Sequence, residues 1–193
     1  MRSLSKLCIA ICSSSVLILS GCQSLTQPQK PIVTPQVQDE NNFNLQGKIG
    51  VRTPQQSGSA FFTWAQQQDE FDIELTGILG VGKTHIQGKP GEVTLNSAKT
   101  GLISATTPEE LLEKATGWQA PIMHLTYWVQ AKPATQNAQI IKDENNRLKQ
   151  LIEDGWTVNF SYNDAQMLPN KLLLKQPLAE DKENRITMVI QNR

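Results

Sequence analysis

Residues 71–87 read Phe-Asp-Ile-Glu-Leu-Thr-Gly-Ile-Leu-Gly-Val-Gly-Lys-Thr-His-Ile-Gln, and this stretch decides the fold. Phe71, Ile73 and Leu75 alternate with acidic or polar neighbours, and Ile86 follows the same period of two beyond the glycines. Such alternation predicts strands with one dry face and one solvated face. The short glycine-rich gap between them predicts an antiparallel hairpin.

A nucleotide-binding motif is apparent in the same stretch. Residues 77–84, Gly-Ile-Leu-Gly-Val-Gly-Lys-Thr, satisfy the phosphate-loop pattern G-x-x-x-x-G-K-[ST]. Phosphate binding by that pattern relies on the N-terminus of a helix directly after the loop. Gly88 and Pro90 leave no room for a helix, and no apolar strand ending in aspartate offers a second magnesium ligand. We therefore reject a nucleotide site.

The hairpin tip is unusually apolar for a segment that normally faces solvent. It contains Ile78, Leu79 and Val81 among glycines. Two interpretations stay open. The tip folds back under a helix as a small separate core, or it stays exposed and touches a membrane or a lipid chain.

Alternation with the same period recurs along the rest of the chain, in residues 43–52, 60–64, 156–162 and 186–190. Short gaps with Gly, Pro or Asn separate the strands, and the long helices needed to connect parallel strands are missing. The sequence therefore predicts a mostly β (α+β) fold built on an antiparallel sheet.

Two helices interrupt the strands. Thr107, Pro108 and Glu110 form an N-terminal capping pattern, with proline in the first turn and glutamate at the third position. We expect this helix to run to about Thr116 and to end at Gly117.

The second helix is expected over residues 121–130, because Pro133 prevents any continuation. Its apolar residues fall on one face, which predicts that both helices lie across one face of the sheet. These residues are Ile122, Leu125, Trp128 and Val129.

The dry face of the sheet is rich in aromatic residues. For any single one of them, filling a solid core is the favoured interpretation, and composition alone does not establish a cavity. The candidates are Phe62, Trp64, Phe71, Trp128, Trp156 and Phe160.

The N-terminus predicts export and lipidation. Arg2 and Lys6 precede a largely apolar run over residues 7–19, which is too short for a membrane-spanning helix and typical of a signal peptide. The run leads into Leu-Ser-Gly before Cys22, which resembles the lipobox of bacterial lipoproteins. That resemblance implies removal of residues 1–21 and acylation of Cys22. The alternative is an ordinary secretory signal with a chance cysteine.

Residues 22–42 are expected to be the acylated cysteine and a flexible tether. The segment is rich in Gln and contains Pro28, Pro31 and Pro35, without hydrophobic periodicity. As a flexible coil it would span roughly 25 Å. Gln23 stands where aspartate would resemble an inner-membrane retention signal, so we expect the protein in the outer membrane.

Composition excludes several classes of function. Lys plus Arg and Asp plus Glu are 18 each, and loss of the signal peptide leaves a slightly acidic chain, which argues against nucleic-acid binding. Only 2 histidines occur, and Cys22 is the one cysteine outside the signal peptide. Zinc clusters, disulfide frameworks and cysteine–histidine catalysis are therefore excluded. We expect one domain over residues 43–193, a monomer without cofactors.

Taken together, these residues resemble the LolB family of outer-membrane lipoprotein receptors. The resemblance runs from the lipobox to about Pro133 and rests on order and spacing rather than on one specific motif. Its pieces are Gly47-Lys48-Ile49-Gly50-Val51, Phe62, Trp64, Gln66, Phe71, Ile73, Leu75, Gly77-Ile78-Leu79-Gly80, Gly88-Lys89-Pro90-Gly91, Leu111, Gly117, Pro121, Leu125 and Trp128.

Three positions depart from the family pattern. Lys48 replaces the usual arginine, Ile78 stands where proline is frequent, and Ala131 stands where glycine is usual after the tryptophan-containing helix. The first two departures bear on the local geometry of a strand and a loop.

The resemblance implies an incomplete antiparallel β-barrel with helices capping an apolar cavity. It implies a receptor that takes lipoproteins from the periplasmic carrier LolA and inserts them into the outer membrane. Its partners would be LolA, the acyl chains of lipoprotein cargo and outer-membrane lipids. Leu79 matches the family's functional loop leucine and would form a membrane-insertion loop with Ile78 and Val81. The acyl cavity would be formed by Phe62, Trp64, Phe71, Ile73, Leu125, Trp128 and Trp156.

Two other functions are alternatives to a lipoprotein receptor. A lipoprotein that carries a free lipid would share the same fold and differ only in its ligand. An envelope hydrolase is disfavoured because no G-x-S-x-G motif occurs and because His85 and His124 lie in no catalytic motif. Glu109 and Glu110 are better explained by helix capping than as an acid–base pair.

Overall fold

The computed structural model describes residues 41–77 and 82–193. The predictions for Cys22 and for Ile78, Leu79 and Val81 lie outside these residues.

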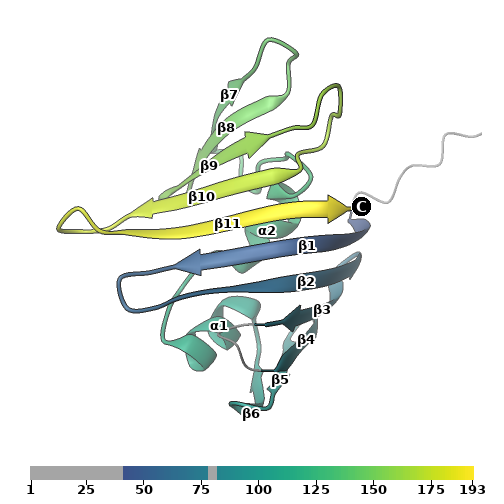
Figure 1. The fold of residues 1–193 in the computed structure, drawn as a ribbon, viewed down its shortest axis with the longest axis vertical. Helices are drawn as coiled ribbons and strands as arrows, with labels where there is room; N and C mark the ends of the chain where they lie inside the picture. Colours follow the sequence, from purple (N-terminus) through teal and green to yellow (C-terminus); the bar gives the residue numbers. More distant parts are fainter. Residues whose placement is uncertain (1–40, 78–81) are drawn as a thin grey trace, which may run out of the picture. The chain divides into compact units, whose positions relative to one another are not determined.

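The domain is built on one antiparallel sheet of 11 strands (Figure 1). Its order is β6-β5-β4-β3-β2-β1-β11-β10-β9-β8-β7, so β6 and β7 form its two edges and the sheet does not close. This confirms the mostly β, incompletely closed antiparallel fold. The strands are β1 Asn42–Arg52, β2 Ser57–Gln67, β3 Glu70–Thr76, β4 Lys83–Lys89, β5 Glu92–Ser97, β6 Gly101–Ala105, β7 Gln139–Lys142, β8 Leu148–Glu153, β9 Trp156–Ser161, β10 Lys171–Pro177 and β11 Glu183–Asn192.

The residues after the phosphate-loop pattern form a strand. β4 starts at Lys83, within the pattern itself. It pairs with β3 from Lys83, which lies opposite Thr76, to Gly88, which lies opposite Phe71. A helix N-terminus for phosphate is therefore absent at this position, as the sequence predicts.

Helix α1, Pro108–Thr116, has the predicted ends. The hydroxyl of Thr107 accepts a hydrogen bond from the backbone N–H of Glu110 at 3.2 Å, and Gly117 ends the helix in the left-handed conformation with φ 70°. The Glu110 carboxylate, however, accepts from the backbone N–H of Thr106 at 2.8 Å, one residue before the cap. Hydrogen bonds from Lys114 and Thr106 lower the pKa of Glu110 to about 2.

Helix α2, Ile122–Trp128, is shorter than predicted. The backbone reverses at Ala131, which has φ 55°, and the N–H of Lys132 donates back to the carbonyl of Tyr127 at 3.1 Å. This left-handed turn ends the helix before Pro133 acts, which is why the predicted end at residue 130 was too late.

Strand β1 is bulged where it meets β11. The register shifts between Gln46 and Gly47, and the backbone of β11 comes very close to Gly47. A Cβ atom at Gly47 would lie 1.9 Å from the carbonyl oxygen of Val189, so only glycine fits.

The main core lies between α2 and the inner face of β1, β2 and β8–β11 (Figure 1). Its alternating inward residues match the predicted dry face. The cluster comprises Leu45, Phe62, Trp64, Ala120, Leu125, Trp128, Val129, Leu148, Leu151, Trp156, Val158, Phe160, Leu172, Leu174, Ile186, Met188 and Ile190.

Candidate functional site

The inner face continues from this core onto β3–β6 as an apolar surface. Phe62 pairs with Leu75 and Trp64 with Ile73, so these side chains share the face of the core residues. The row extends through Ile86 on β4. Leu95 of β5 and Ile103 of β6 complete it, because directly opposite residues point to the same side.

This part of the inner face is only partly covered. Val93 of β5 is buried there, but the other large apolar side chains of β3–β6 on this face are neither fully exposed nor buried, although α1 packs against β5 and β6. The half-buried side chains are Phe71, Ile73, Leu75, Ile86, Leu95 and Ile103. A sheet that needed no ligand would gain by covering them, since burial of apolar area is favourable.

The seven predicted acyl-cavity residues all lie on this one inner face or on the helix that covers it. Five of them, Phe62, Trp64, Leu125, Trp128 and Trp156, are packed in the core and at most 6% exposed. The other two, Phe71 and Ile73, are half-buried and pack at the border of that core.

Sequence reasoning missed the half-buried residues Leu75, Ile86, Leu95 and Ile103 as site candidates. Leu75 and Ile86 belonged to the predicted strands, and continuing the same alternation into β5 and β6 would have found the other two. Most of the aromatic side chains predicted for the cavity are instead buried in the core, because they have large apolar areas to bury.

Trp118 is a further site residue that the sequence did not single out. It follows the end of α1 and contacts Trp156 edge-to-face, with ring centroids 6.5 Å apart. Its ring N–H is buried without a hydrogen-bond partner among the described residues. The half-buried ring therefore adds an apolar wall at the border between the core and the open surface.

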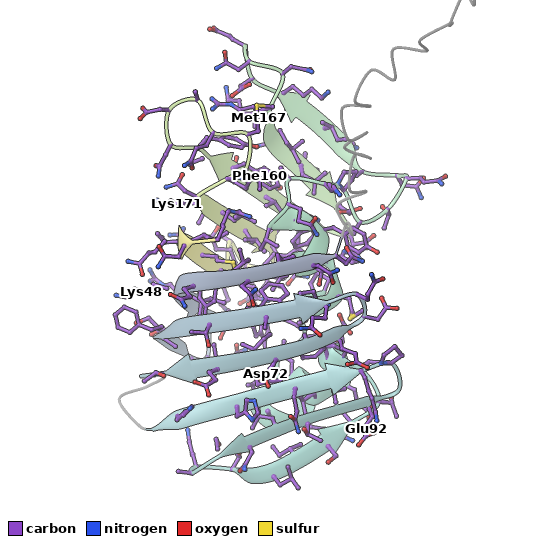
Figure 2. All side chains as sticks on the ribbon, turned by 90° about the vertical axis from the view of Figure 1, so that its right-hand side faces the viewer. Lys48, Asp72, Glu92, Phe160, Met167 and Lys171 are labelled. Carbon is purple, nitrogen blue, oxygen red and sulfur yellow. The ribbon has the colours of Figure 1, made fainter. Side chains whose placement is uncertain are left out.

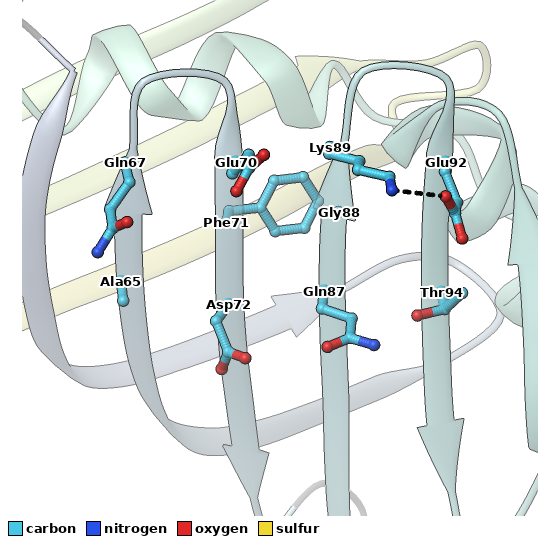
Figure 3. A pocket seen from close by; sticks show the side chains of 10 residues that line it. All are labelled: Ala65, Gln67, Glu70, Phe71, Asp72, Gln87, Gly88, Lys89, Glu92 and Thr94. Atoms are coloured by element: carbon cyan, nitrogen blue, oxygen red, sulfur yellow. Dashed lines mark ion pairs between the residues drawn. The ribbon is translucent and has the colours of Figure 1, made fainter.

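Phe71 lies across Gly88 on the neighbouring strand (Figure 3). A Cβ atom at Gly88 would come within 2.4 Å of the Phe71 ring and 2.3 Å of the Val93 side chain. Glycine at this position therefore makes room for the ring in the row of inner-face side chains.

A hollow of about 410 Å³ lies on the other side of these strands, at the end near their hairpins (Figure 3). Most of its lining is polar, including Asp72, Gln87 and the ion pair between Lys89 and Glu92 at 3.1 Å. Charged and amide groups on an exposed face do not suit an acyl chain. Phe71 and Gly88 also line the hollow, so it adjoins the apolar surface, but it offers mainly polar groups and is not the acyl seat.

Glu153 is a buried carboxylate beneath α2. It accepts hydrogen bonds from the Trp128 ring N–H at 2.7 Å, from the backbone N–H of Ala134 at 3.1 Å and from the backbone N–H of Thr135. Burial raises its pKa, but these donors outweigh that effect and hold the pKa of Glu153 below its ordinary value. The carboxylate fixes α2 and the following loop onto β8.

Neither histidine belongs to a catalytic arrangement. His85 pairs with exposed Asp72 at 2.8 Å, and His124 lies 3.5 Å from Asp154. Across residues 41–77 and 82–193, no group of three potential metal-ligating side chains comes together. None of the helices in those ranges is long and apolar enough to cross a bilayer.

The family model for the outer-membrane lipoprotein LolB matches residues 41–192. The chain belongs to the LolB family. The match continues well past Pro133, where the sequence resemblance was expected to fade. The alternating strands of the C-terminal half are therefore part of the family pattern too.

Curated LolB proteins cover most of the chain. An outer-membrane lipoprotein LolB of Pseudomonas putida is 38% identical over 81% of this chain and 76% of its own length. The LolB of Stutzerimonas stutzeri is 35% identical over 91% of this chain and 90% of its own length. Among solved structures, a chain of the Pseudomonas aeruginosa MucA/MucB complex matches with a TM-score of 0.38 and 11% identity, covering 78% of this chain and 51% of that one.

Membership of the LolB family makes this protein an outer-membrane lipoprotein that acts as a lipoprotein receptor and not as an enzyme.

The structure also explains two departures from the LolB pattern. Lys48 lies 5.7 Å from the centre of the Phe61 ring and so keeps a cationic group on the outer face. Ala131 occupies a left-handed position that glycine adopts without strain.

Proposed function

We propose that the protein takes lipoproteins from the periplasmic carrier LolA and inserts them into the outer membrane. The observation that carries this proposal is the half-buried apolar inner face of β3–β6 beside a fully packed core. Acyl chains must stay out of water, and a partly open apolar surface gives them a place without unfolding the core.

The acyl chains would lie along the row Phe71, Ile73, Leu75, Ile86 and Leu95. The buried aromatic residues behind this row form its wall, with Phe62 and Trp64 on β2 and Trp156 on β9. Leu125 and Trp128 hold α2 against that wall. Small adjustments of α1 would widen the space, since α1 contributes only Leu111 as a fully buried residue.

Transfer in one direction needs no cofactor in this scheme. A receptor that holds the chains about 1.4 kcal/mol more favourably than the carrier gains roughly a tenfold bias. The bilayer holds several acyl chains more favourably still, at about 0.8 kcal/mol for each buried methylene group. The order carrier, receptor, membrane is then downhill throughout.

The chain would divide into three functional parts. Residues 1–21 serve as the lipoprotein signal peptide, and residues 22–42 provide the acylated Cys22 and a flexible tether. Residues 43–193 form the single lipoprotein-binding domain. Leu79, with Ile78 and Val81, would deliver cargo by touching the membrane. Its support is the apolar composition of the tip and the family resemblance.

Photo-cross-linking from the inner face tests the acyl seat directly. A photoreactive amino acid at Leu95 should cross-link to the acyl chain of a lipoprotein supplied on LolA. The same group at Asn96, which is exposed and points to the outer face of β5, should not. Equal cross-linking at both positions would contradict the seat. Cross-linking to added free fatty acid, but never to lipoprotein, would favour a carrier of free lipid.

A further inference from the structure

A second hollow, also of about 410 Å³, lies on the outer face of the sheet where β1, β2 and β11 meet. Its floor is Gly50, where an added Cβ atom would have no neighbour closer than 3.9 Å. Ser59 and Thr187 lie directly opposite Gly50 on the two neighbouring strands, and Arg52 and Arg185 also line the hollow. The hollow therefore offers hydroxyl and guanidinium donors around an open floor.

Two arginines face each other across β1 and β11 at this place. Arg52 pairs directly with Arg185, and Lys175 of β10 lies opposite Arg185 on its other side. Like charges directly opposite each other on one face of a sheet are destabilising. Glu183 offsets part of this repulsion, because its carboxylate pairs with Arg185 and lies 4.0 Å from the Lys175 ammonium group. Within this group of four side chains, three cations stand against one carboxylate, so positive charge remains in excess.

Donors of the two arginines remain available for an anion. Arg52 is exposed and makes no ion pair with another described residue. The Nε atom of Arg185 is buried and has no hydrogen-bond partner in the same part of the chain. A buried guanidinium N–H without an acceptor costs free energy, which a bound anion would recover. A phosphate group suits the site, because a guanidinium donates to two phosphate oxygens at once and the neighbouring hydroxyls can donate to a third.

The hollow lies at the end of the sheet from which the β3–β4 hairpin leaves. β1 ends at Arg52. Thr76, the last residue of β3, pairs with Phe61, which is only two residues along β2 from Ser59. The chain then continues into residues 77–82, the apolar hairpin tip that the proposed function brings to the membrane. A positively charged hollow beside that tip would meet the phosphate layer of the same bilayer.

We propose that this hollow binds the phosphate group of a membrane phospholipid, with Arg52 and Arg185 as cationic donors and Ser59 and Thr187 as hydroxyl donors. The inference rests on the proposed function, which places this end of the sheet at the bilayer. A headgroup held on the outer face would keep the hairpin tip at the membrane while cargo acyl chains stay on the inner face. Because the contact depends on partly exposed charges, it should weaken in high salt.

Lys171 on β10 provides a matched control. Its side chain is an exposed cation on the same outer face, four residues from Lys175 and farther from the hairpin end. Lys171 and Lys48 lie opposite Val189 on its two sides, and Figure 2 labels both lysines on the left of the sheet. Loss of the Lys171 charge changes the net charge of this face as much as loss of the Arg52 charge, but it leaves the hollow intact.

A fluorescent dye at Gln55→Cys, in the exposed β1–β2 turn three residues after Arg52, tests the proposal. The acylated protein is reconstituted in phosphatidylethanolamine–phosphatidylglycerol vesicles that carry nitroxide-labelled headgroups. We expect the dye to be quenched in the parent, and quenching to fall at least about threefold with Arg52→Gln or in high salt. Lys171→Gln should leave the quenching unchanged.

Gly50→Val separates a formed site from a diffuse charged surface. The open space above Gly50 admits the valine side chain, which fills the floor of the hollow while both arginines remain. We expect quenching to fall about as much as with Arg52→Gln, and the melting temperature to stay close to that of the parent. Unchanged quenching in Gly50→Val would overturn the proposal. Equal losses in Arg52→Gln and Lys171→Gln would also overturn it.

The Leu95 cross-link separates failure of this proposal from failure of the proposed function. An unquenched dye in a protein that still cross-links acyl chains at Leu95 would overturn the headgroup site alone. Quenching that depends on Arg52, without any cross-link at Leu95, would support the headgroup site and contradict the acyl seat. Inorganic phosphate, added without vesicles at constant ionic strength, tests a free anion. A rise in melting temperature there, with no quenching on vesicles, would overturn the assignment to a lipid.

Discussion

The two halves of the inner face share one alternating pattern but differ in what covers them. In the half made by β8–β11, Leu151, Val158 and Leu172 are completely buried. In the half made by β3–β6, Ile73, Ile86 and Leu95 remain half-buried. Strand periodicity alone therefore does not make a core. We call these the sealed half and the open half.

The helices account for this difference. α2 has only 7 residues, yet Leu125 and Trp128 are both buried, and Glu153 fastens it from below. α1 has 9 residues but fully buries only Leu111. The sealed half supplies stability, which lets the open half keep apolar surface uncovered, as the proposed acyl seat requires.

Two glycines, one in each half, differ in what surrounds them. Gly47 meets the backbone of β11, which cannot move, whereas Gly88 meets the side chains of Phe71 and Val93. A backbone contact is a stricter demand than a side-chain contact, since side chains can change rotamer.

The largest effect is expected for Gly47→Ala. The new Cβ atom would lie 1.9 Å from the Val189 carbonyl oxygen, so β1 and β11 would have to separate. We expect a loss of more than about 4 kcal/mol in the free energy of unfolding, or no folded protein at all. Urea unfolding of the variant and the parent measures this loss in the free energy of unfolding.

Gly50→Ala is the matched control for that change. It lies on the same strand, and its nearest neighbour, the Gly58 carbonyl oxygen, is 3.9 Å away. We expect a change of less than about 1 kcal/mol. Similar losses for the two variants would mean that the close approach at Gly47 relaxes freely.

A pair of leucine truncations compares the halves directly. Leu172→Ala leaves a cavity in the sealed half and should cost about 3 kcal/mol. Leu95→Ala removes a half-buried side chain from the open half and should cost about 1 kcal/mol, while weakening acyl binding. Chemical denaturation and binding of a fluorescent acyl probe give both results. Equal costs would show that the open half is packed as tightly as the sealed half.

Much of this fold could be predicted from local pattern. The alternation of Phe71, Ile73 and Leu75 indicated an antiparallel hairpin, and Thr107 and Gly117 indicated both ends of α1. These features depend on neighbours in the sequence, so the sequence displays them.

The division into halves could not be predicted, because it depends on where α2 lies. Alternation shows which side chains share a face, but not whether a helix covers that face. Nothing in the sequence singles out Glu153, since its donors Trp128, Ala134 and Thr135 are distant along the chain. The loop between β9 and β10 depends in the same way on distant residues, since Arg147 and Arg193 donate hydrogen bonds to its backbone carbonyls.

Glu153→Gln tests the polar anchor of the sealed half. The substitution keeps the shape but weakens three charge-assisted hydrogen bonds, so we expect a loss of about 2 kcal/mol at neutral pH. The pKa of Glu153 is depressed below its ordinary value of 4.5, so its contribution is present above that pH and disappears as the pH falls through the lower folded-state pKa.

The pH dependence supplies the control for this prediction. Melting temperatures of the parent and Glu153→Gln should differ at pH 7 and converge under acid conditions. Exposed Glu113→Gln should follow the parent throughout. A constant difference at every pH would show that the charge of Glu153 is not what fastens α2.

The smallest effect is expected for Ala131→Gly, and it has the opposite sign. Ala131 has φ 55°, where an alanine is strained by about 1–2 kcal/mol and a glycine is not. Part of that gain is offset, because glycine has more freedom in the unfolded chain and the Ala131 methyl group packs against the core. We expect a net stabilisation of about 0.5 kcal/mol, seen as a small rise in melting temperature.

Ala115→Gly, inside α1, is the control and should instead destabilise the protein by about 1 kcal/mol. Since Ala131 lies at the exit of α2, the gain belongs to the sealed half, and acyl-probe affinity should stay unchanged. If Ala131→Gly lowers stability, the methyl contact outweighs the strain, and the left-handed turn is not a weak point of the sealed half.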